Sequence, residues 1–254
     1  MEFINRFNNG FIQSIVKSIF YAVTDDIRRD TRKAHLDRSY MNSYPSRIWD
    51  LINRNLFYSL GNNDDIIIRS TSRGPWKLAA IFDKKTEMLL TIMREERFFS
   101  VIKDKNNSHH YISHLAQMFN VDLEKFQQTI FEQESDEDEV KKTISRICND
   151  LFISSDMIKH HAIVLFSAQN EMLNSIRCVM INRNFEECES ISWNDFIPVS
   201  ESIVVEQINN SVVHNTNTPN RGLKLTNKAK EKQGLNSNIS YKPDKSLDSE
   251  KSNN

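Results

Sequence analysis

The sequence predicts an α+β fold in which helices cover one or more antiparallel sheets. Two helical patterns, at residues 11–37 and 46–60, precede short apolar segments that are typical of strands. A second pair of helical patterns, at 110–132 and 137–152, precedes another group of such segments. The composition then changes near residue 205, where Asn, Ser and Lys become dominant. Helices and strands in separate runs favour an antiparallel sheet rather than a βαβ fold.

The first helical pattern is amphipathic. Phe11, Ile15 and Ile19 recur at helical spacing, and Lys17 interrupts the apolar stretch, which indicates an amphipathic helix rather than a signal peptide. For the second helix we expect Ser46 as the N-cap, with Pro45 outside the helix.

Six segments are expected to be strands. The residues around Asp83–Glu87 form a polar connector of hairpin length between two of them, and further turns are expected near Gln169–Asn170 and Asn182–Asn184. The pattern leaves open whether the strands form one sheet or two. The expected strands are 66–69, 76–82, 88–93, 161–166, 176–181 and 189–193.

The composition divides the chain at residue 205. Residues 1–204 are expected to form an α+β globular domain, or two sub-domains at 1–105 and 106–204. The segment 205–254 contains one aromatic residue, Tyr241, and carries a net charge of +3. Such a segment buries too little apolar area to offset its ordering entropy, so we expect a disordered C-terminal tail.

Several functional classes are excluded by composition. The formal net charge of the 254-residue chain is −1, which excludes a strongly basic coat protein. The three cysteines, Cys148, Cys178 and Cys188, lack CxxC spacing, so neither a disulfide framework nor a structural zinc site is expected. This cysteine usage, and the absence of any apolar stretch of about 18 residues, indicate a cytoplasmic protein that does not insert into a membrane.

Glycine usage excludes the common nucleotide-binding loops. Residues 1–204 contain three glycines and no GxxxxGK[ST], GxGxxG or GxSxG motif. We therefore expect no cofactor.

Positive charge and tryptophan coincide in one part of the chain. Residues 28–54 contain seven basic and three acidic residues, a net charge of +4. Two of the three tryptophans of the chain lie close to an arginine in sequence: Trp49 follows Arg47, and Trp76 follows Arg73. An arginine stacked on an indole ring is a recurring recognition platform. The alternative is that both tryptophans fill the core where helix and sheet meet. The expected partner-binding residues are Arg47, Trp49, Arg73, Trp76 and Lys77.

Two nuclease alternatives also remain open. Arg29 and His35 have the Arg-x5-His form of the HEPN ribonucleases, in which an arginine binds phosphate and a histidine acts on an oxygen. The HEPN resemblance implies an all-helical bundle, which the strand-like segments do not fit. A metal-dependent nuclease would use Asp83, Glu87 and Glu95, but no Glu-x-Lys follows Asp83. We therefore expect no metal ligands.

Four short motifs resemble those of an uncharacterised family of low-GC Gram-positive bacteria. They are Arg47-Ile-Trp-Asp-Leu-Ile-Asn53, Arg73-Gly-Pro-Trp76, Ile81-Phe-Asp83 and Met93-Arg-Glu-Glu-Arg-Phe98, within residues 40–120. The resemblance implies a bacterial, cytoplasmic setting and brings no activity or catalytic residue with it. The 27 asparagines are consistent with an AT-rich genome.

These observations favour a non-enzymatic binding or regulatory protein. Its expected partner is a nucleic acid or an acidic protein surface, because positive charge is segregated on a nearly neutral chain. The oligomeric state is left open by the sequence.

Overall fold

The computed structural model describes most of the first 199 residues. The expected disordered tail at 205–254 lies outside the described residues. The described ranges are 3–35, 40–73, 76–104, 107–123 and 137–199.

One six-stranded sheet forms the centre of the fold, and its strands follow chain order from β1 to β6. All neighbouring strands are antiparallel except β3 and β4, which are parallel. This confirms the α+β class with a mostly antiparallel sheet, and it shows a single sheet in the described chain. Because β3 pairs with β4, this one sheet contains strands from both sides of residue 105, the boundary between the two possible sub-domains. The strands are Ile66–Arg73, Trp76–Asp83, Met88–Arg94, His160–Gln169, Met172–Ile181 and Glu187–Ser192.

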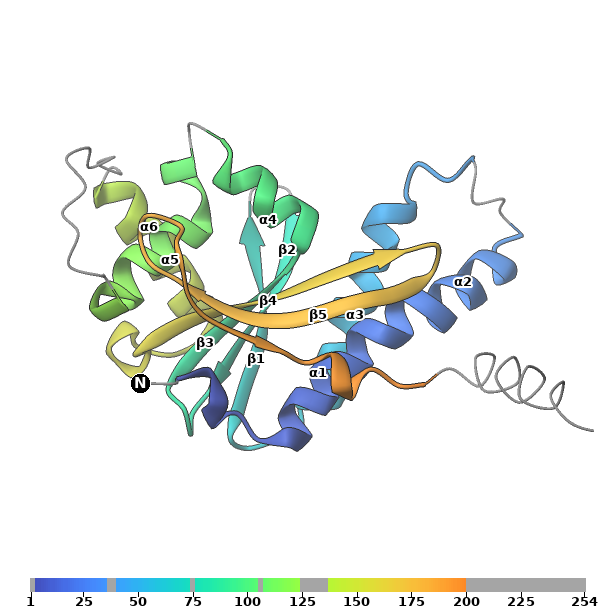
Figure 1. Cartoon of the computed structure of the whole chain (residues 1–254), viewed down its shortest axis with the longest axis horizontal. Helices are drawn as coiled ribbons and strands as arrows, with labels where there is room; N and C mark the ends of the chain where they lie inside the picture. The colour runs from blue at the N-terminus through green and yellow to red at the C-terminus, as the bar shows by residue number, and fades with distance from the viewer. Residues whose placement is uncertain (1–2, 36–39, 74–75, 105–106, 124–136, 200–254) are drawn as a thin grey trace, which may run out of the picture. The chain divides into compact units, whose positions relative to one another are not determined.

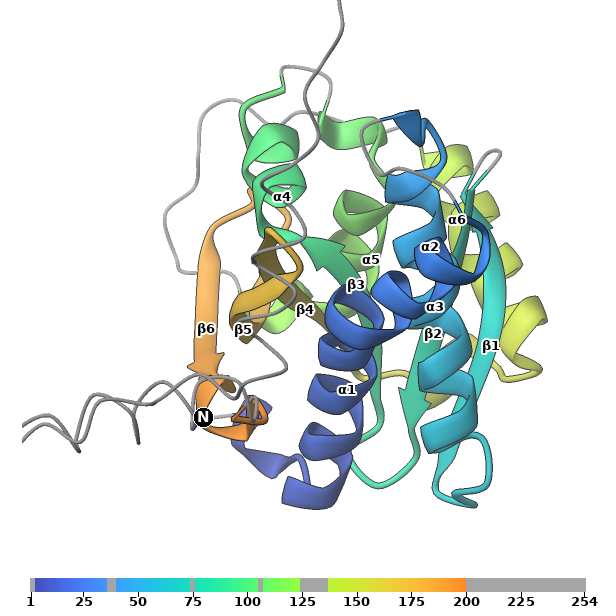
Figure 2. The same ribbon diagram turned by 90° about the vertical axis from the view of Figure 1, so that its right-hand side faces the viewer.

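Helices cover both faces of this sheet. α1 and α3 pack on one face, and the helices that connect β3 to β4 pack on the other (Figures 1 and 2). The crossover between β3 and β4 is required because parallel neighbours cannot be joined by a tight turn. The helices are α1 (Asn9–Tyr21), α2 (Ile27–Lys33), α3 (Tyr44–Leu60), α4 (Glu95–Ile102), α5 (Tyr111–Phe119) and α6 (Glu137–Leu151).

The alternation of side chains along each strand creates two hydrophobic cores. In β4, Ala162, Val164 and Phe166 face α1 and α3, whereas Ile163 and Leu165 face α5 and α6. All five are fully buried. This explains why β4 reads as a continuous apolar run: it is a central strand that is covered on both sides.

Two expectations about helix boundaries were wrong. Pro45 lies in the first turn of α3 rather than outside it, a position where its missing N–H costs nothing. No helix was expected directly after the strand at 88–93, but Glu95 begins α4. Glu95 and Glu96 suit the positive end of the helix dipole, and the apolar pair further along, Phe98 and Val101, is buried.

The expected helix at 11–37 is interrupted. α1 is followed by a π-helical segment, Ala22–Asp26, before α2 begins at Ile27. π-helical turns are rare in proteins, and those that do occur are often found at functional sites. Beyond α2, His35 has a left-handed backbone conformation with φ of 49°.

Candidate functional site: a basic groove

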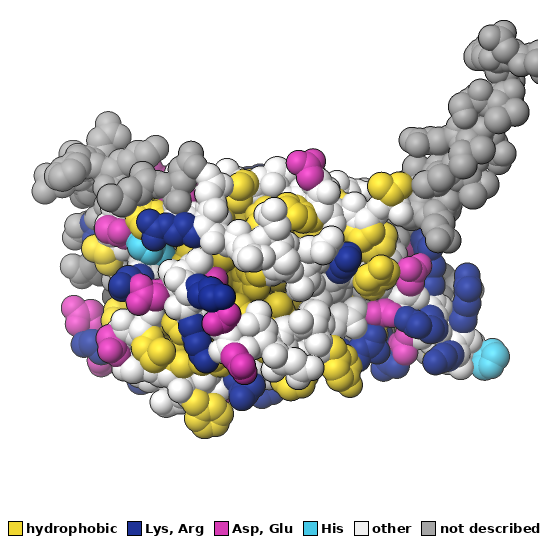
Figure 3. All heavy atoms as spheres, turned by 90° about the horizontal axis from the view of Figure 1, so that it is seen from below, with side chains coloured by type: hydrophobic (Ala, Val, Ile, Leu, Met, Phe, Trp, Pro, Cys, Tyr) yellow, Lys and Arg dark blue, Asp and Glu magenta, His cyan; other side chains and the backbone are white. Residues whose placement is uncertain are grey.

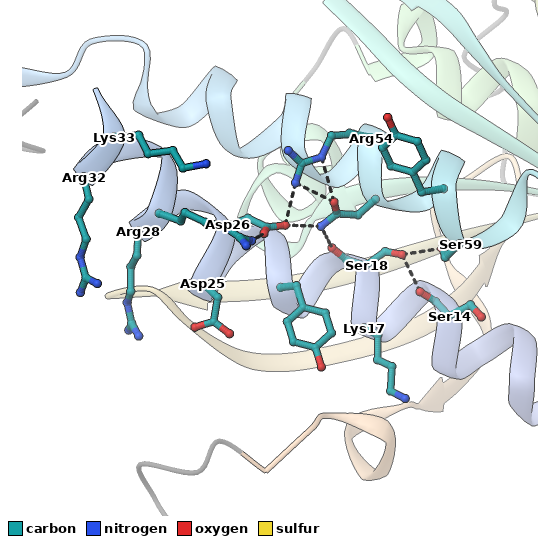
Figure 4. A pocket seen from close by; sticks show the side chains of 14 residues that line it. Ser14, Lys17, Ser18, Asp25, Asp26, Arg28, Arg32, Lys33, Arg54 and Ser59 are labelled. Atoms are coloured by element: carbon teal, nitrogen blue, oxygen red, sulfur yellow. Dashed lines mark hydrogen bonds and ion pairs between the residues drawn. The ribbon is translucent and has the colours of Figure 1, made fainter. Parts of the chain in front are cut away.

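An open groove runs between two helical walls (Figure 4). One wall is formed by α1, the π-helical segment and α2, and the other by α3. Its cavity volume is about 1260 Å³, larger than most small-molecule pockets. We call it the basic groove; its lining residues are Ser14, Lys17, Ser18, Tyr21, Asp25, Asp26, Arg28, Arg29, Arg32, Lys33, Arg54, Asn55, Tyr58 and Ser59.

Helical periodicity explains how these residues reach one surface. Along α1, Ser14, Lys17 and Tyr21 follow one another at intervals of three and four, on the side away from the apolar stripe. On α3, Arg54 and Tyr58 are four positions apart and therefore also lie on one side of the helix. Each helix therefore buries one stripe against the sheet and presents the other to the groove.

The floor of the groove is organised around Asp26. Its side chain is only 8% exposed, and its two oxygens accept hydrogen bonds from three side chains. Arg29 pairs with Oδ1, whereas Arg54 Nη2 and Asn55 Nδ2 donate to Oδ2 at 3.0 and 2.8 Å. A single carboxylate thus fixes groups from α2 and α3.

Serine hydroxyls join the walls at the other end. The Oγ atoms of Ser18 and Ser59 lie 2.8 Å apart, and Ser18 Oγ also donates to the carbonyl of Ser14 at 2.7 Å. Asn55 Nδ2 donates to the carbonyl of Ser18 at 3.2 Å. These bonds connect α1 to α3 along the groove floor (Figure 4).

The groove has a strong excess of positive charge. Six basic and two acidic side chains line it. Arg28 pairs with Glu171 outside the groove at 2.6 Å, but Lys17, Arg32 and Lys33 form no ion pair with any described residue. Lys and Arg side chains also gather on the surface over α2, at the right of Figure 3. The groove therefore offers uncompensated positive charge to an anionic ligand.

Arg47 lies next to the groove rather than in it. Its guanidinium pairs with Asp30 through two hydrogen bonds, one of them 3.0 Å long. The hydrogen bond and charge of Arg47 lower the pKa of Asp30. Asp30 lies in a smaller depression that Arg29, Lys33 and Arg54 also line.

The other expected partner-binding residues do not gather around Arg47. Trp49 is half-buried, and its ring packs edge-on against Phe166 at a centroid distance of 5.7 Å. Trp76 is 60% exposed at the start of β2. By strand alternation it lies on the sheet face opposite α3, so Trp49 and Trp76 face different layers. Arg73 pairs with Trp76 in register across the β1–β2 hairpin.

Lys77, the last residue of the expected set, lies next to Trp76 on β2. Its Nζ donates to Ser72 Oγ at 2.7 Å. Arg73 and Trp76 are therefore cross-strand neighbours at the hairpin, whereas strand alternation places Lys77 on the other face of the sheet, the face that α3 covers.

The two residues of the HEPN alternative, Arg29 and His35, do not line the same cavity. Arg29 lines the groove and pairs with Asp26, whereas His35 is exposed beyond α2 and is not among the lining residues. The six-stranded sheet differs from the all-helical bundle that this resemblance implies.

The carboxylates of the metal-dependent alternative do not converge. Asp83 accepts hydrogen bonds from Lys85 N and Thr86 Oγ1, at 3.0 and 2.8 Å, and so shapes the β2–β3 turn. Glu87 lies just before β3 and Glu95 just after it, so eight residue steps of extended chain, roughly 26 Å, separate them. No group of three metal-ligating side chains occurs in the part of the chain that the structure describes.

Glu87 and Glu95 each have a partner of opposite charge. Glu87 pairs with Lys159 at 2.6 Å, and Glu95 pairs with Arg177 at 2.7 Å. Arg177 also pairs with Glu187 at 2.7 Å. Its hydrogen bonds to Glu187 and Glu95 raise the pKa of Arg177.

Sequence reasoning identified the basic side chains of α2 and Arg54 of α3, but missed other lining residues of both walls. Asp26, Tyr21 and Tyr58 were not singled out. The signal for Tyr21 was a polar stripe at helical spacing beside the apolar stripe of α1. That stripe predicts a surface, but it does not predict that α3 lies beside it.

The described helices include none that is both long and apolar enough to cross a bilayer. Neither a curated protein nor a solved structure matches the chain. The profile of one family, described as a family of unknown function (DUF5986), matches residues 5–241. This match includes both walls of the basic groove and the whole sheet. The chain therefore belongs to the DUF5986 family.

Proposed function

We propose that this protein binds nucleic acid, without processing it, through phosphate contacts in the basic groove. The observation that carries the proposal is the set of three cations, Lys17, Arg32 and Lys33, that have no ion pair among the described residues. They lie in a groove with six basic side chains on a chain of net charge −1. Segregated positive charge of this kind attracts a phosphate backbone.

The arrangement of the arginines supports phosphate as the ligand. Guanidinium groups bind phosphate through paired N–H donors, and they do so best when their orientation is fixed. Asp26 holds both Arg29 and Arg54 while leaving each of them about half exposed. Their remaining N–H groups are available to a ligand in the groove.

We also infer a bacterial, cytoplasmic setting. The motifs around Arg47 and Trp76 and the cysteine usage support this inference. An acidic protein surface is the competing partner, and the experiment below separates it from nucleic acid.

The test is fluorescence anisotropy of labelled 20-nucleotide RNA and DNA at several salt concentrations. The double substitution R32E/K33E should weaken binding at least tenfold and reduce the slope of log K against log salt by about two. The matched control is K141E/K142E on α6, where two exposed lysines lie on the opposite side of the sheet. The control should change affinity by less than about threefold.

Two results would overturn the proposal. Absence of salt-dependent binding at low salt would exclude nucleic acid and favour an acidic protein partner. A probe that becomes shorter with time, with or without Mg²⁺, would show a nuclease instead of a binding protein.

A further inference from the structure

We propose that the basic groove takes single-stranded nucleic acid, whose bases stack on Tyr21 and Tyr58. This inference rests on the proposed function and deepens it. Proteins that bind single strands combine a positively charged groove with aromatic side chains that stack on the bases. The basic groove contains both kinds of residue.

The two tyrosines belong to opposite walls of the groove. Tyr21 ends α1 and is 43% exposed, and Tyr58 lies in the last turn of α3 and is 73% exposed. Both line the same cavity as the six basic side chains. A duplex contacts such a groove through its phosphates, whereas unpaired bases can also reach the aromatic rings.

Neighbouring rings support both tyrosines. The ring of Tyr21 packs edge-on against Phe20, at a centroid distance of 5.4 Å, and the ring of Tyr58 against Phe57 at 6.4 Å. Neither tyrosine hydroxyl bonds to another residue within the described ranges. The rings are therefore partly held without being committed to the core, as a stacking surface requires.

Cations lie towards both ends of the groove. Figure 4 shows Arg28, Arg32 and Lys33 towards one end and Lys17 towards the other. Residues 17 and 28 are eleven positions apart, which corresponds to roughly 16 Å along a helical axis. This distance accommodates a short single-stranded segment, with phosphates at the cations and bases between them.

The test compares single-stranded and duplex probes on the full-length protein. The double substitution Y21A/Y58A should weaken binding of single-stranded DNA or RNA at least tenfold, while affinity for a duplex of the same sequence changes less than about threefold. Y21F/Y58F should retain single-strand affinity because a phenyl ring also stacks. F152A removes a ring that is 84% exposed outside the groove, and it should leave binding unchanged.

The outcomes separate the two proposals. Salt-dependent binding that Y21A/Y58A does not weaken, or that is equal for single strands and duplex, overturns the stacking inference and leaves the proposed function standing. Absence of binding by any probe overturns both. An unchanged urea midpoint for each variant shows that a loss of affinity does not come from unfolding. The comparison of RNA with DNA probes shows which sugar the protein prefers.

Discussion

Asp26 is the residue on which the geometry of the basic groove depends. It comes from the π-helical segment, and its nearly buried carboxylate binds groups from α2 and α3. A buried carboxylate costs free energy unless it is paired and hydrogen-bonded, and here Arg29, Arg54 and Asn55 supply both. Asp26 therefore contributes to stability and to the orientation of two arginines at once.

This double role predicts effects of different size for two neighbouring substitutions. Asp26→Asn should lower the free energy of unfolding by about 1–3 kcal/mol, because it leaves Arg29 and Arg54 without their shared charge. Asp25→Asn removes the same charge from the exposed lining of the groove and should change stability by less than about 0.5 kcal/mol. Urea denaturation measures both.

Nucleic-acid binding provides the second readout for this pair. Asp25→Asn should strengthen binding slightly, because the groove then has one less negative charge. Equal stability of the two variants would contradict the structural role of Asp26.

His161 is a titratable residue inside the sheet. It is fully buried, its Nε2 lies 3.0 Å from Thr91 Oγ1, and burial lowers its pKa to about 3. An unfolded chain has a histidine pKa near 6.5. Between these two values the unfolded state binds a proton that the folded state does not, so the free energy of unfolding falls as the pH falls below 6.5.

The expected size of this effect is up to about 1.4 kcal/mol per pH unit for one histidine. His161→Gln keeps a hydrogen-bonding group beside Thr91 but cannot titrate, so its stability should depend less on pH between 7 and 5. His114, whose pKa burial also lowers, will keep part of the slope in both proteins. Urea midpoints at several pH values measure the difference. Identical slopes would show that folding does not lower the pKa of His161.

At the scale of elements, α3 shows how one helix serves both the core and the groove. Trp49 packs against Phe166 of β4, while Arg54 and Tyr58 line the groove. Trp76, by contrast, begins β2 and remains mostly exposed. The two tryptophans that the sequence pairs with arginine therefore have different surroundings.

This difference predicts different costs of truncation. Trp49→Ala should lower the free energy of unfolding by about 2–4 kcal/mol, because it leaves a cavity beside Phe166. Trp76→Ala should change it by no more than about 0.5 kcal/mol. Thermal and urea unfolding measure the stability of both variants, and Trp76→Ala serves as the control for Trp49→Ala. A large cost for Trp76 would show that its ring is buried in the protein in solution.

The elements also show what the sequence can and cannot predict. Short-range patterns located all six strands and most helices, because alternation and helical spacing act over a few residues. α4 was missed because its eight residues are charged at the start and contain only two buried side chains. The groove depends on pairs far apart in sequence, such as Arg28 with Glu171 and Arg54 with Asp26. No local pattern specifies such pairs.

At the scale of the whole molecule, positive charge is separated from negative charge. Residues 1–204 have a net charge of −4, although they include the basic groove, and residues 205–254 have a net charge of +3. The other residues of 1–204 therefore carry a net negative charge, which disfavours binding of a polyanion outside the groove. Two positive regions, the groove and the C-terminal segment, could then account for binding to nucleic acid.

Truncation after residue 204 distinguishes these two regions. If the groove is the binding site, the shortened chain should keep its dependence on Arg32 and Lys33, and its salt slope should stay within about one of the full-length value. Its urea midpoint should also be unchanged, since residues 3–199 contain both hydrophobic cores that the structure describes. Loss of binding with an unchanged midpoint would assign the site to 205–254. A lowered midpoint would show that the family match, which extends to residue 241, marks a longer folding unit.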